Sequence, residues 1–457
     1  MKDNLRKSIQ PYAARIISSS AVLNAKRCLV EYKRRLLQQP HQVAIYLRIN
    51  DPYSYLLVQV LPDLQRRFQI EMHFKTILHL RDDMYPEAEM WHDNAFIDAN
   101  HLAHLYDLKF PSKAPQQTDA ESAIQATHKL LSLESRALEK DFDWQQVNRI
   151  FEQYWFPQDC DSSELSRGPV HQDETKLAQH LIENEQTLAK QGHYMSAMLH
   201  YNGEWYWGLD RLDHLEKRLN TLGVNDSRYA KDVVFNKTYV NFCQQPAIDK
   251  VALGKQALAD KKLIVFFSIR SPYSHIGLEQ AIKLAQHYDL TLDIKPILPM
   301  IMRGLSVPDS KKMYIFHDTK REASKLGIDY GFVADPLGQG VENCYSLFAY
   351  AQSLGCEQSF LLNYARGVNA QGIRSETDKG LKLIVQRSGM DWAHAKTLLQ
   401  DPATQTAWHQ WAEDNRQQML ALGSWGVPTF QYGDLVLWGQ DRLGLIEQAI
   451  RKERSLK

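Results

Sequence analysis

The chain contains nearly the same strand-to-helix junction twice, as "VAIYLRINDPYSY" (Val43–Tyr55) and as "LIVFFSIRSPYSH" (Leu263–His275). In each stretch an apolar, β-prone run leads to a proline, a residue favoured at the first position of a helix. Residues with helical spacing follow, so both stretches predict a strand that ends at the N-terminus of a helix. The residue before the proline differs, because it is Asp51 in the first stretch and Ser271 in the second.

Other segments recur in the same order, which is typical of a duplicated domain. The repeated anchors are Pro52–Ser54 with Pro272–Ser274, Asp98 with Asp318, and "WGLDRL" (Trp207–Leu212) with "WGQDRL" (Trp438–Leu443). The sequence therefore predicts a tandem duplication.

Both copies show the same order of expected elements, with two strands around a helix, a long helical stretch, two short strands and a last helix. The expected strands are 43–49, 70–76, 197–201 and 204–207 in the first copy and 263–269, 290–297, 429–431 and 435–438 in the second, with helices at 53–67 and 273–287. This order predicts the α/β class: two tandem thioredoxin-like domains, each with a helical domain inserted between its βαβ and ββα halves.

Four segments are expected on this basis: an N-terminal helical arm (1–41), a first domain (42–222), a linker (223–261) and a second domain (262–457). The arm is basic and rich in serine, which leaves a transit peptide open. We interpret it instead as an amphipathic helix that packs on the first domain.

Charge and cysteine content argue against several function classes. Lys+Arg and Asp+Glu are balanced at 54 each, whereas nucleic-acid binders normally carry a basic surplus, so no nucleic acid is expected as a partner. No apolar run reaches the roughly 18 residues of a membrane span, so no membrane partner is expected. The 5 cysteines are scattered without a Cys-x-x-Cys pair, which argues against a dithiol motif or a metal site and fits a reducing cytoplasm.

Ser271 is the first candidate functional residue. A serine before a helix-opening proline suits capping alone, because its hydroxyl accepts a hydrogen bond from a free backbone amide. The same position suits an anion, since the helix N-terminus is positive and the hydroxyl can donate to it. A thiol bound there would have a lowered pKa. Both interpretations stay open at this point.

Two later motifs could complete a ligand site. In "GVPTF" (Gly426–Phe430) a cis peptide between Val427 and Pro428 would free the Val427 backbone to pair with an extended peptide. In "WGQDRL", Gln440 and Asp441 open the last helix, where Asp441 is either a cap or a partner for a ligand ammonium group. Such a site would fit the α-amino-acid end of γ-glutamyl-cysteinyl-glycine.

Together, "FFSIRSPYSHIG" (Phe266–Gly277), "GVPTF" and "WGQDRLGLIEQAI" (Trp438–Ile450) resemble the 2-hydroxychromene-2-carboxylate isomerases. That family belongs with the kappa-class glutathione transferases and the DsbA-like thioredoxin fold. The resemblance covers residues 262 to about 453 and also includes "VPDSKKMYIFHDTKREASKLGI" (Val307–Ile328).

The resemblance implies glutathione as the cofactor. It implies that Ser271 activates the glutathione thiol. It further implies that Val427 and cis-Pro428 hold the cysteinyl backbone, and that Gln440 and Asp441 hold the γ-glutamyl end.

The substrate side departs from the family pattern. The family usually has a Gly-Asn-x-Pro-Pro stretch where this chain has the shorter "RGLSVPDS" (Arg303–Ser310), without the asparagine. Lys311 and Tyr314 are candidates for lining this side, with a solvated lysine and a core tyrosine as the alternatives.

The first copy lacks two of the three ligand-holding features. Asp51 would repel a thiolate and raise its pKa, and Ala197 stands where the second copy has Pro428. Asp210 and Arg211 persist, but they also suit a helix start. We therefore interpret this copy as degenerate and structural, with Asp51 as an acid/base group of a different site as the alternative.

The leading hypothesis is a cytoplasmic enzyme, a glutathione-dependent isomerase or transferase that acts on a small electrophile, with an aromatic one favoured. The second hypothesis is a DsbA-like thiol–disulfide oxidoreductase, which would need a cysteine in place of Ser271 or Ser274. The third is a non-catalytic binding or scaffold protein, in which the two copies pack as an intramolecular pseudo-dimer.

Overall fold

The computed structural model of the 457-residue chain describes residues 2–85, 87–114, 120–136, 143–158, 174–238, 242–244 and 262–453. The chain divides into two compact units. The N-terminal unit is Lys26–Lys237, and the C-terminal unit is Thr238–Lys457 together with Met1–Ala25. The predicted linker lies partly outside the described residues.

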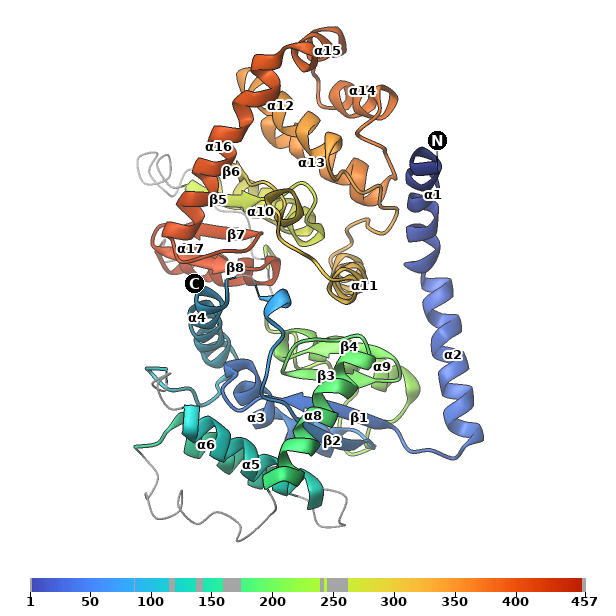
Figure 1. Ribbon diagram of the computed structural model, residues 1–457, viewed down its shortest axis with the longest axis vertical. Helices are drawn as coiled ribbons and strands as arrows, with labels where there is room; N and C mark the ends of the chain where they lie inside the picture. Colours follow the sequence, from blue (N-terminus) through green and yellow to red (C-terminus); the bar gives the residue numbers. More distant parts are fainter. Residues whose placement is uncertain are drawn as a thin grey trace. The chain divides into compact units, whose positions relative to one another are not determined.

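The N-terminal unit contains a four-stranded sheet in the order β2-β1-β3-β4 (Figure 1). Strand β1 pairs in parallel with β2 and antiparallel with β3, which forms a hairpin with β4. The elements are β1 (Gln42–Leu47), α3 (Pro52–Arg67), β2 (Glu71–Thr76), η1 (Asp82–Met84), α4 (Ala88–Tyr106), α5 (Ala120–Arg136), α6 (Trp144–Trp155), α8 (Glu174–Lys190), β3 (Met198–Tyr201), β4 (Glu204–Trp207), η2 (Leu209–Arg211) and α9 (Leu212–Leu222). Most residues of β1 are buried, as expected of a central strand that is covered on both faces.

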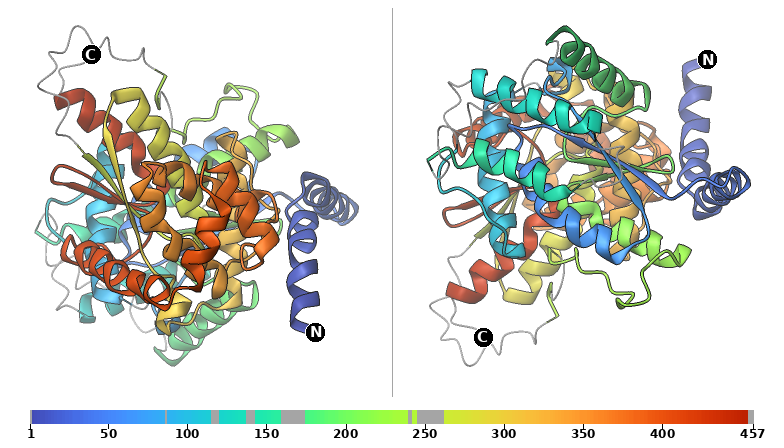
Figure 2. Two further views of the ribbon diagram at one scale, coloured as in Figure 1. Left: turned by 90° about the horizontal axis from the view of Figure 1, so that it is seen from above. Right: turned by 90° about the horizontal axis from the view of Figure 1, so that it is seen from below.

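The C-terminal unit contains a second four-stranded sheet, in the order β6-β5-β7-β8, with the same strand directions. Its elements are β5 (Lys262–Phe267), α10 (Pro272–Tyr288), β6 (Thr291–Pro296), η3 (Met300–Arg303), α11 (Asp309–Lys325), α12 (Gln339–Ser353), α13 (Glu357–Ala370), α14 (Asp378–Arg387), α15 (Trp392–Gln400), α16 (Pro402–Ala421), β7 (Thr429–Tyr432), β8 (Leu435–Trp438), η4 (Gln440–Arg442) and α17 (Leu443–Glu453). Figures 1 and 2 show the inserted helices α12 to α15 as one group beside the sheet.

The core of the C-terminal unit explains why β5 is the central strand. Alternate β5 side chains, Val265 and Phe267 among them, pack with the buried face of α10 and with the inserted helices. Phe266 points to the other face of the sheet, where it packs with Met419 of α16. Burial on both faces requires a nearly continuous apolar strand, and "LIVFF" supplies it.

The strands and the two junction helices expected from the sequence are confirmed, with differences only at their ends. The order βαβ, helical insertion, ββα is thus observed in the C-terminal unit, and the N-terminal sheet has the same strand order.

The N-terminal arm differs from its expectation, because it consists of two helices, α1 (Lys2–Ile17) and α2 (Ser20–Leu36). Helix α1 does not pack on the first domain as expected, since its contacts lie in the C-terminal unit. There the Tyr12 ring lies 5.3 Å from that of Phe332, and Ser18 Oγ donates to the Gly331 carbonyl at 3.3 Å. Helix α2 instead places Arg27 on Glu204 of the N-terminal unit.

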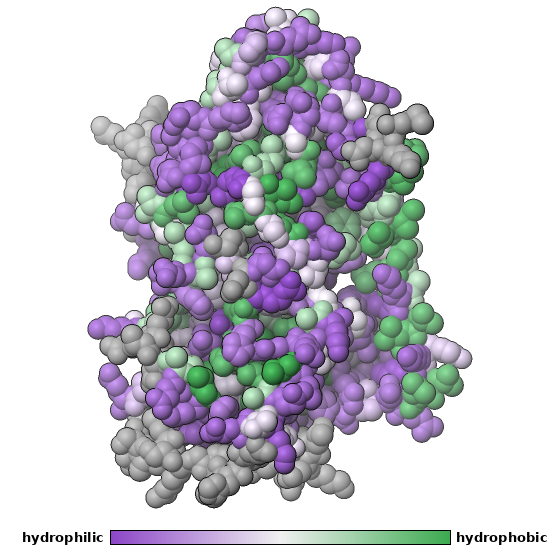
Figure 3. Space-filling model, viewed as in Figure 1, coloured by the Kyte–Doolittle hydropathy of each residue, from purple (hydrophilic) through white to green (hydrophobic). Residues whose placement is uncertain are grey.

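Large apolar side chains remain exposed along the arm. In Figure 3 green atoms gather over α1 and α2 at the right of the view. On α1 the side chains of Leu5, Ile9, Tyr12 and Ile16 are each more than half exposed. Among the described residues, no helix combines the length and the apolar character that a bilayer crossing requires.

Candidate functional site

Ser271 lies between the end of β5 and the start of α10, as predicted. It caps the helix, with an extended backbone (φ −78°, ψ 120°), and its Oγ accepts a hydrogen bond from the backbone amide of Ser274 at 3.2 Å. Ser274 Oγ in turn accepts from the Ser268 amide at 3.3 Å, which ties the helix start to the strand end. A hydroxyl that accepts a bond still has its proton to donate. Ser271 is partly exposed, so capping and ligand binding are compatible at this residue.

The Val427–Pro428 peptide bond is cis, as predicted. Pro428 lies directly against α10 at Gly277, where a Cβ would come within 3.1 Å of Pro428 Cγ and 2.9 Å of Phe430 Cζ. The absence of a side chain at Gly277 therefore permits the close approach of this segment to the helix. Val427 is half-buried, and within the described residues its backbone takes part in no hydrogen bond.

Gln440 and Asp441 lie in the 3-10 turn η4 rather than in the first turn of the last helix, which begins only at Leu443. This corrects the expected position, and the reason is local. Gly439 has φ 102°, and the Gly439 amide donates to the Pro428 carbonyl at 2.9 Å, so the chain turns tightly before the helix can begin. Both side chains are buried, and η4 packs against α10. The structure thus gathers Ser271, Pro428 and the η4 residues around one helix.

Lys311 and Tyr314 lie in the first turns of α11, and both are half-buried. Helix α11 packs against α10, and the Tyr273 hydroxyl donates to Asp318 Oδ2 at 2.7 Å across this contact. Their helix therefore neighbours the site, while their substrate-lining role stays a prediction.

Sequence reasoning did not predict the ionic chain that His275, Glu279 and Arg366 form at α10, the helix of the candidate site. His275 is fully buried, its Nε2 lies 3.2 Å from Glu279 Oε1, and the Arg366 guanidinium binds both Glu279 oxygens at 2.7 and 2.6 Å. Burial raises the pKa of Glu279, but the hydrogen bonds from Arg366 and His275 outweigh it and lower that pKa to about 2. The available sequence signal is His275 of "SPYSH", because the similar stretch "DPYSY" has Tyr55 at this place.

The cysteines of the C-terminal unit are poor nucleophiles. Burial raises the pKa of the Cys243 thiol to about 12, with Glu447 adding to the shift. Burial also raises the pKa of Cys344 and of Cys356. Because a thiolate is the reactive species, these environments suppress thiol chemistry.

The corresponding junction of the N-terminal unit is sealed. Asp51 is only 1% exposed, and its carboxylate accepts hydrogen bonds from the Tyr53 and Ser54 amides at 3.3 and 3.1 Å and from Ser54 Oγ at 2.7 Å. An ionised carboxylate accepts only, so Asp51 caps α3 with no proton left to donate. Ala197 has φ 55°, a left-handed backbone that a proline cannot adopt.

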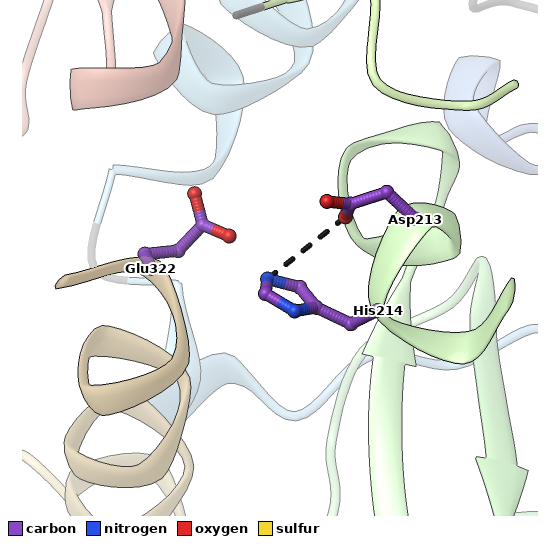
Figure 4. A group of neighbouring side chains, drawn as sticks. All are labelled: Asp213, His214 and Glu322. Atoms are coloured by element: carbon purple, nitrogen blue, oxygen red, sulfur yellow. Dashed lines mark ion pairs between the residues drawn. The ribbon is translucent and has the colours of Figure 1, made fainter. Parts of the chain in front are cut away.

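A titratable pair lies at the start of α9, where His214 Nε2 is 3.9 Å from Asp213 Oδ1 (Figure 4). Glu322, which Figure 4 also shows, belongs to α11 of the C-terminal unit. Within the N-terminal unit this pair supplies two ligand atoms, fewer than a structural metal site requires. We assign no metal site to it.

Comparison with known proteins identifies the C-terminal domain. Residues 262–451 match the DsbA-like thioredoxin domain. The C-terminal half of the chain is a DsbA-like thioredoxin domain. A 2-hydroxychromene-2-carboxylate isomerase of Pseudomonas putida is 24% identical over 193 residues, which cover 40% of this chain and 92% of that protein. The DsbA-like domain therefore has a distant homologue in this isomerase.

Solved structures also resemble part of the chain. A 2-hydroxychromene-2-carboxylate isomerase is 24% identical and aligns with 43% of this chain and 99% of its own, at a TM-score of 0.37. A probable DsbA oxidoreductase from Streptomyces coelicolor is 18% identical and aligns with 43% of this chain and 91% of its own, at a TM-score of 0.34.

Proposed function

We propose that the protein is a glutathione-dependent isomerase or transferase that acts on a small electrophile, with an aromatic one favoured. The observation that carries this proposal is the Ser271 hydroxyl, which is partly exposed at the N-terminus of α10 and keeps its proton while it caps the helix. A donor at a positive helix end stabilises a sulfur anion.

The residues around Ser271 match the functional groups of glutathione. The backbone of Val427, unpaired within the described part of the chain, suits the cysteinyl residue, because an extended peptide can add to it as a short strand. Gln440 offers a buried side-chain amide nitrogen that has no hydrogen-bond partner among the described residues. Asp441 supplies the negative charge for the ligand ammonium group. The donor set thus fits a γ-glutamyl-cysteinyl peptide.

Each residue would have a separate task. Glutathione, when bound, supplies a nucleophilic thiol. Ser271 donates its proton toward the sulfur and favours the ionised form, while the N-terminal amides of α10 add to this field. Val427 fixes the peptide along the strand start, and Gln440 with Asp441 sets its register. Lys311 and Tyr314 would line the substrate side.

The distant relationship to an isomerase and the DsbA-like domain both support an enzyme. A DsbA-like oxidoreductase is the runner-up, but the first turn of α10, Pro272 to His275, contains no cysteine. The raised pKa values of Cys243 and Cys344 also disfavour it. A cytoplasmic location, where glutathione is reduced, belongs to the same proposal.

We further propose that the two units are duplicated copies and that the N-terminal copy has lost the glutathione site. Equivalent hydrogen bonds recur at equivalent positions. Tyr53 donates to Asp98 at 2.8 Å as Tyr273 does to Asp318, and the Gly208 amide donates to the Ala197 carbonyl as Gly439 does to Pro428. Shared strand order together with shared side-chain pairs supports common descent of the two units.

Product analysis with glutathione and an aromatic α,β-unsaturated ketone tests the function. A rearranged ketone with glutathione recovered would indicate an isomerase, and an accumulating conjugate would indicate a transferase. Turnover by the protein without glutathione would contradict the proposal. A rate with protein and glutathione no higher than the rate with glutathione alone would also contradict it. Rapid reduction of a model disulfide by the protein would favour the oxidoreductase.

A further inference from the structure

Arg48 of the N-terminal unit is a buried cation, and one edge of its guanidinium group, formed by Nε and Nη2, has no hydrogen-bond partner among the described residues. It follows β1 directly and is only 3% exposed. Its Nε and Nη2 atoms are buried, and neither makes a hydrogen bond within the described part of the chain. An arginine does not lose its proton in a protein, so burial without a counter-charge is costly.

The Nε and Nη2 atoms form the edge of the guanidinium with which two other arginines of this unit bind a carboxylate. In the N-terminal unit Arg27 binds Glu204 through Nε at 2.8 Å and Nη2 at 2.7 Å. Arg34 binds Glu31 in the same manner, at 2.9 and 2.8 Å. This side-on edge matches the two oxygens of a carboxylate, which gives the pair its strength and its geometry.

The nearest carboxylate in the sequence does not fill this role. The Asp51 oxygens are engaged by the amides of α3 and by the Ser54 hydroxyl. The pKa of Tyr85 is raised, mainly by burial. Arg48 and Asp51 both act on it electrostatically, since the Arg48 charge opposes this rise and the Asp51 charge adds to it. The two charges are thus near each other without forming an ion pair through the free edge.

Tyr85 offers a second donor, and the charge of Arg48 acts on it electrostatically. Tyr85 is 8% exposed, and its buried hydroxyl has no hydrogen-bond partner in the described ranges. Its ring lies 5.0 Å from that of Trp91, centroid to centroid, and 6.3 Å from that of Tyr194. His92 follows Trp91 in the chain. Its pKa is lowered, first by burial and second by the charge of Arg48, which favours the neutral imidazole. Two unpaired donors in an aromatic surrounding are suited to an anion with an apolar body.

We propose that the N-terminal unit binds a small monocarboxylate, with Arg48 holding both carboxylate oxygens and Tyr85 donating to one of them. This goes beyond the glutathione site, which lies in the other unit. The C-terminal unit has Ser268 at the position that corresponds to Arg48, so the cation distinguishes the N-terminal copy. The N-terminal unit then has a ligand of its own and is more than a structural remnant.

Calorimetric titration of the full-length protein with sodium acetate and with sodium benzoate tests this proposal, at constant ionic strength against sodium chloride. We expect saturable carboxylate binding by the wild type and at least tenfold weaker binding by Arg48→Met, whose side chain fills a similar volume without the charge. Tyr85→Phe keeps the ring and removes one donor, and it should weaken binding about fivefold. Arg66→Met serves as the control, because Arg66 lies on the surface of α3.

Glutathione binding separates this site from the C-terminal one, because Arg48→Met should leave glutathione affinity unchanged. Equal responses to acetate and chloride in the wild type would overturn the proposal, as would Arg48→Met and Tyr85→Phe variants that bind carboxylate like the wild type. Tighter binding of inorganic phosphate than of either carboxylate would overturn the assigned ligand class. If Arg48→Met fails to fold, Tyr85→Phe alone still decides the outcome.

Discussion

At the residue scale, Ser271 and Asp51 differ in whether the side chain that caps the helix has a proton to donate. Both side chains accept hydrogen bonds from the first amides of their helices. The serine keeps a proton to donate and is partly exposed, whereas the carboxylate has none and is sealed. Capping and thiol activation, which the sequence presents as alternatives, are therefore compatible at Ser271.

Ala197 shows why the N-terminal unit could not acquire the Val-Pro motif of the C-terminal unit by a single substitution. Because its φ is 55°, Ala197→Pro should destabilise the N-terminal unit by about 3 kcal/mol or more, whereas Ala197→Gly should change stability by about 1 kcal/mol or less. Scanning calorimetry of the two variants measures the difference. A proline variant as stable as the wild type would contradict the equivalence drawn between Ala197 and Pro428.

The sequence predicts Ser271 and Pro428 as site residues because both lie in short, recognisable motifs. It does not identify Arg48, since an arginine after a strand is ordinarily solvated and only tertiary packing buries it. Burial and the loss of partners are properties of the whole fold, and a single sequence does not display them.

At the element scale, α10 carries the candidate site, and Gly277 fixes the distance between this helix and Pro428. Gly277→Ala should weaken glutathione binding by about tenfold, because the new methyl group would press on Pro428 and Phe430 at a cost of about 1–3 kcal/mol. Calorimetric titration with glutathione measures the loss. Gly367→Ala of α13 is the matched control. Its methyl group would meet side-chain atoms of Ile384 at 3.2 and 3.3 Å and of Ile373 at 3.5 Å, away from Pro428, so glutathione binding by this variant should be unchanged.

The ion pair between Glu279 and Arg366 links α10 to α13 in a pH-dependent way. The pKa of Glu279 is lowered from 4.5 to about 2, so its stabilisation is complete above pH 4.5 and is lost as the pH falls toward 2. Glu279→Gln should therefore cost about 1–2 kcal/mol at pH 7 and almost nothing near pH 2. Melting curves across this range test it. Glu413→Gln, at an exposed pair with Arg416, should cost under about 1 kcal/mol, and an equal loss in both variants would contradict this ranking.

The sequence predicts which segments are helices and strands more reliably than it predicts where they end and what they contact. Apolar runs and turn residues sufficed for every strand of both sheets, because hydrophobic period determines strand burial. The turn η4 was expected as helix, since the hydrogen bond from Gly439 to Pro428 that shapes it joins residues of different elements. The contact of α1 with Phe332 is likewise a long-range pairing that helical periodicity does not specify.

At the scale of the whole molecule, the two units share strand order and a tyrosine–aspartate hydrogen bond at equivalent positions. Tyr53→Phe and Tyr273→Phe should each destabilise their own unit, because each leaves a carboxylate without its hydroxyl donor. The loss should be about 1 kcal/mol for Tyr53, whose partner Asp98 is half-buried, and about 2 kcal/mol for Tyr273, whose partner Asp318 is fully buried. Hydrogen exchange in each unit locates the effect, and a loss confined to the opposite unit would contradict the equivalence.

The central claim is that Ser271 activates a bound glutathione thiol, and ultraviolet titration of that thiol on the protein tests it most directly. The wild type should bind glutathione and lower the pKa of its thiol by at least one unit, worth about 1.4 kcal/mol. Ser271→Asp retains a capping group but offers no proton, so its bound thiol should titrate at or above the free value. Ser271→Thr, which keeps the hydroxyl, should resemble the wild type. A wild-type protein that binds no glutathione, or whose bound thiol titrates as in free solution, would contradict the account.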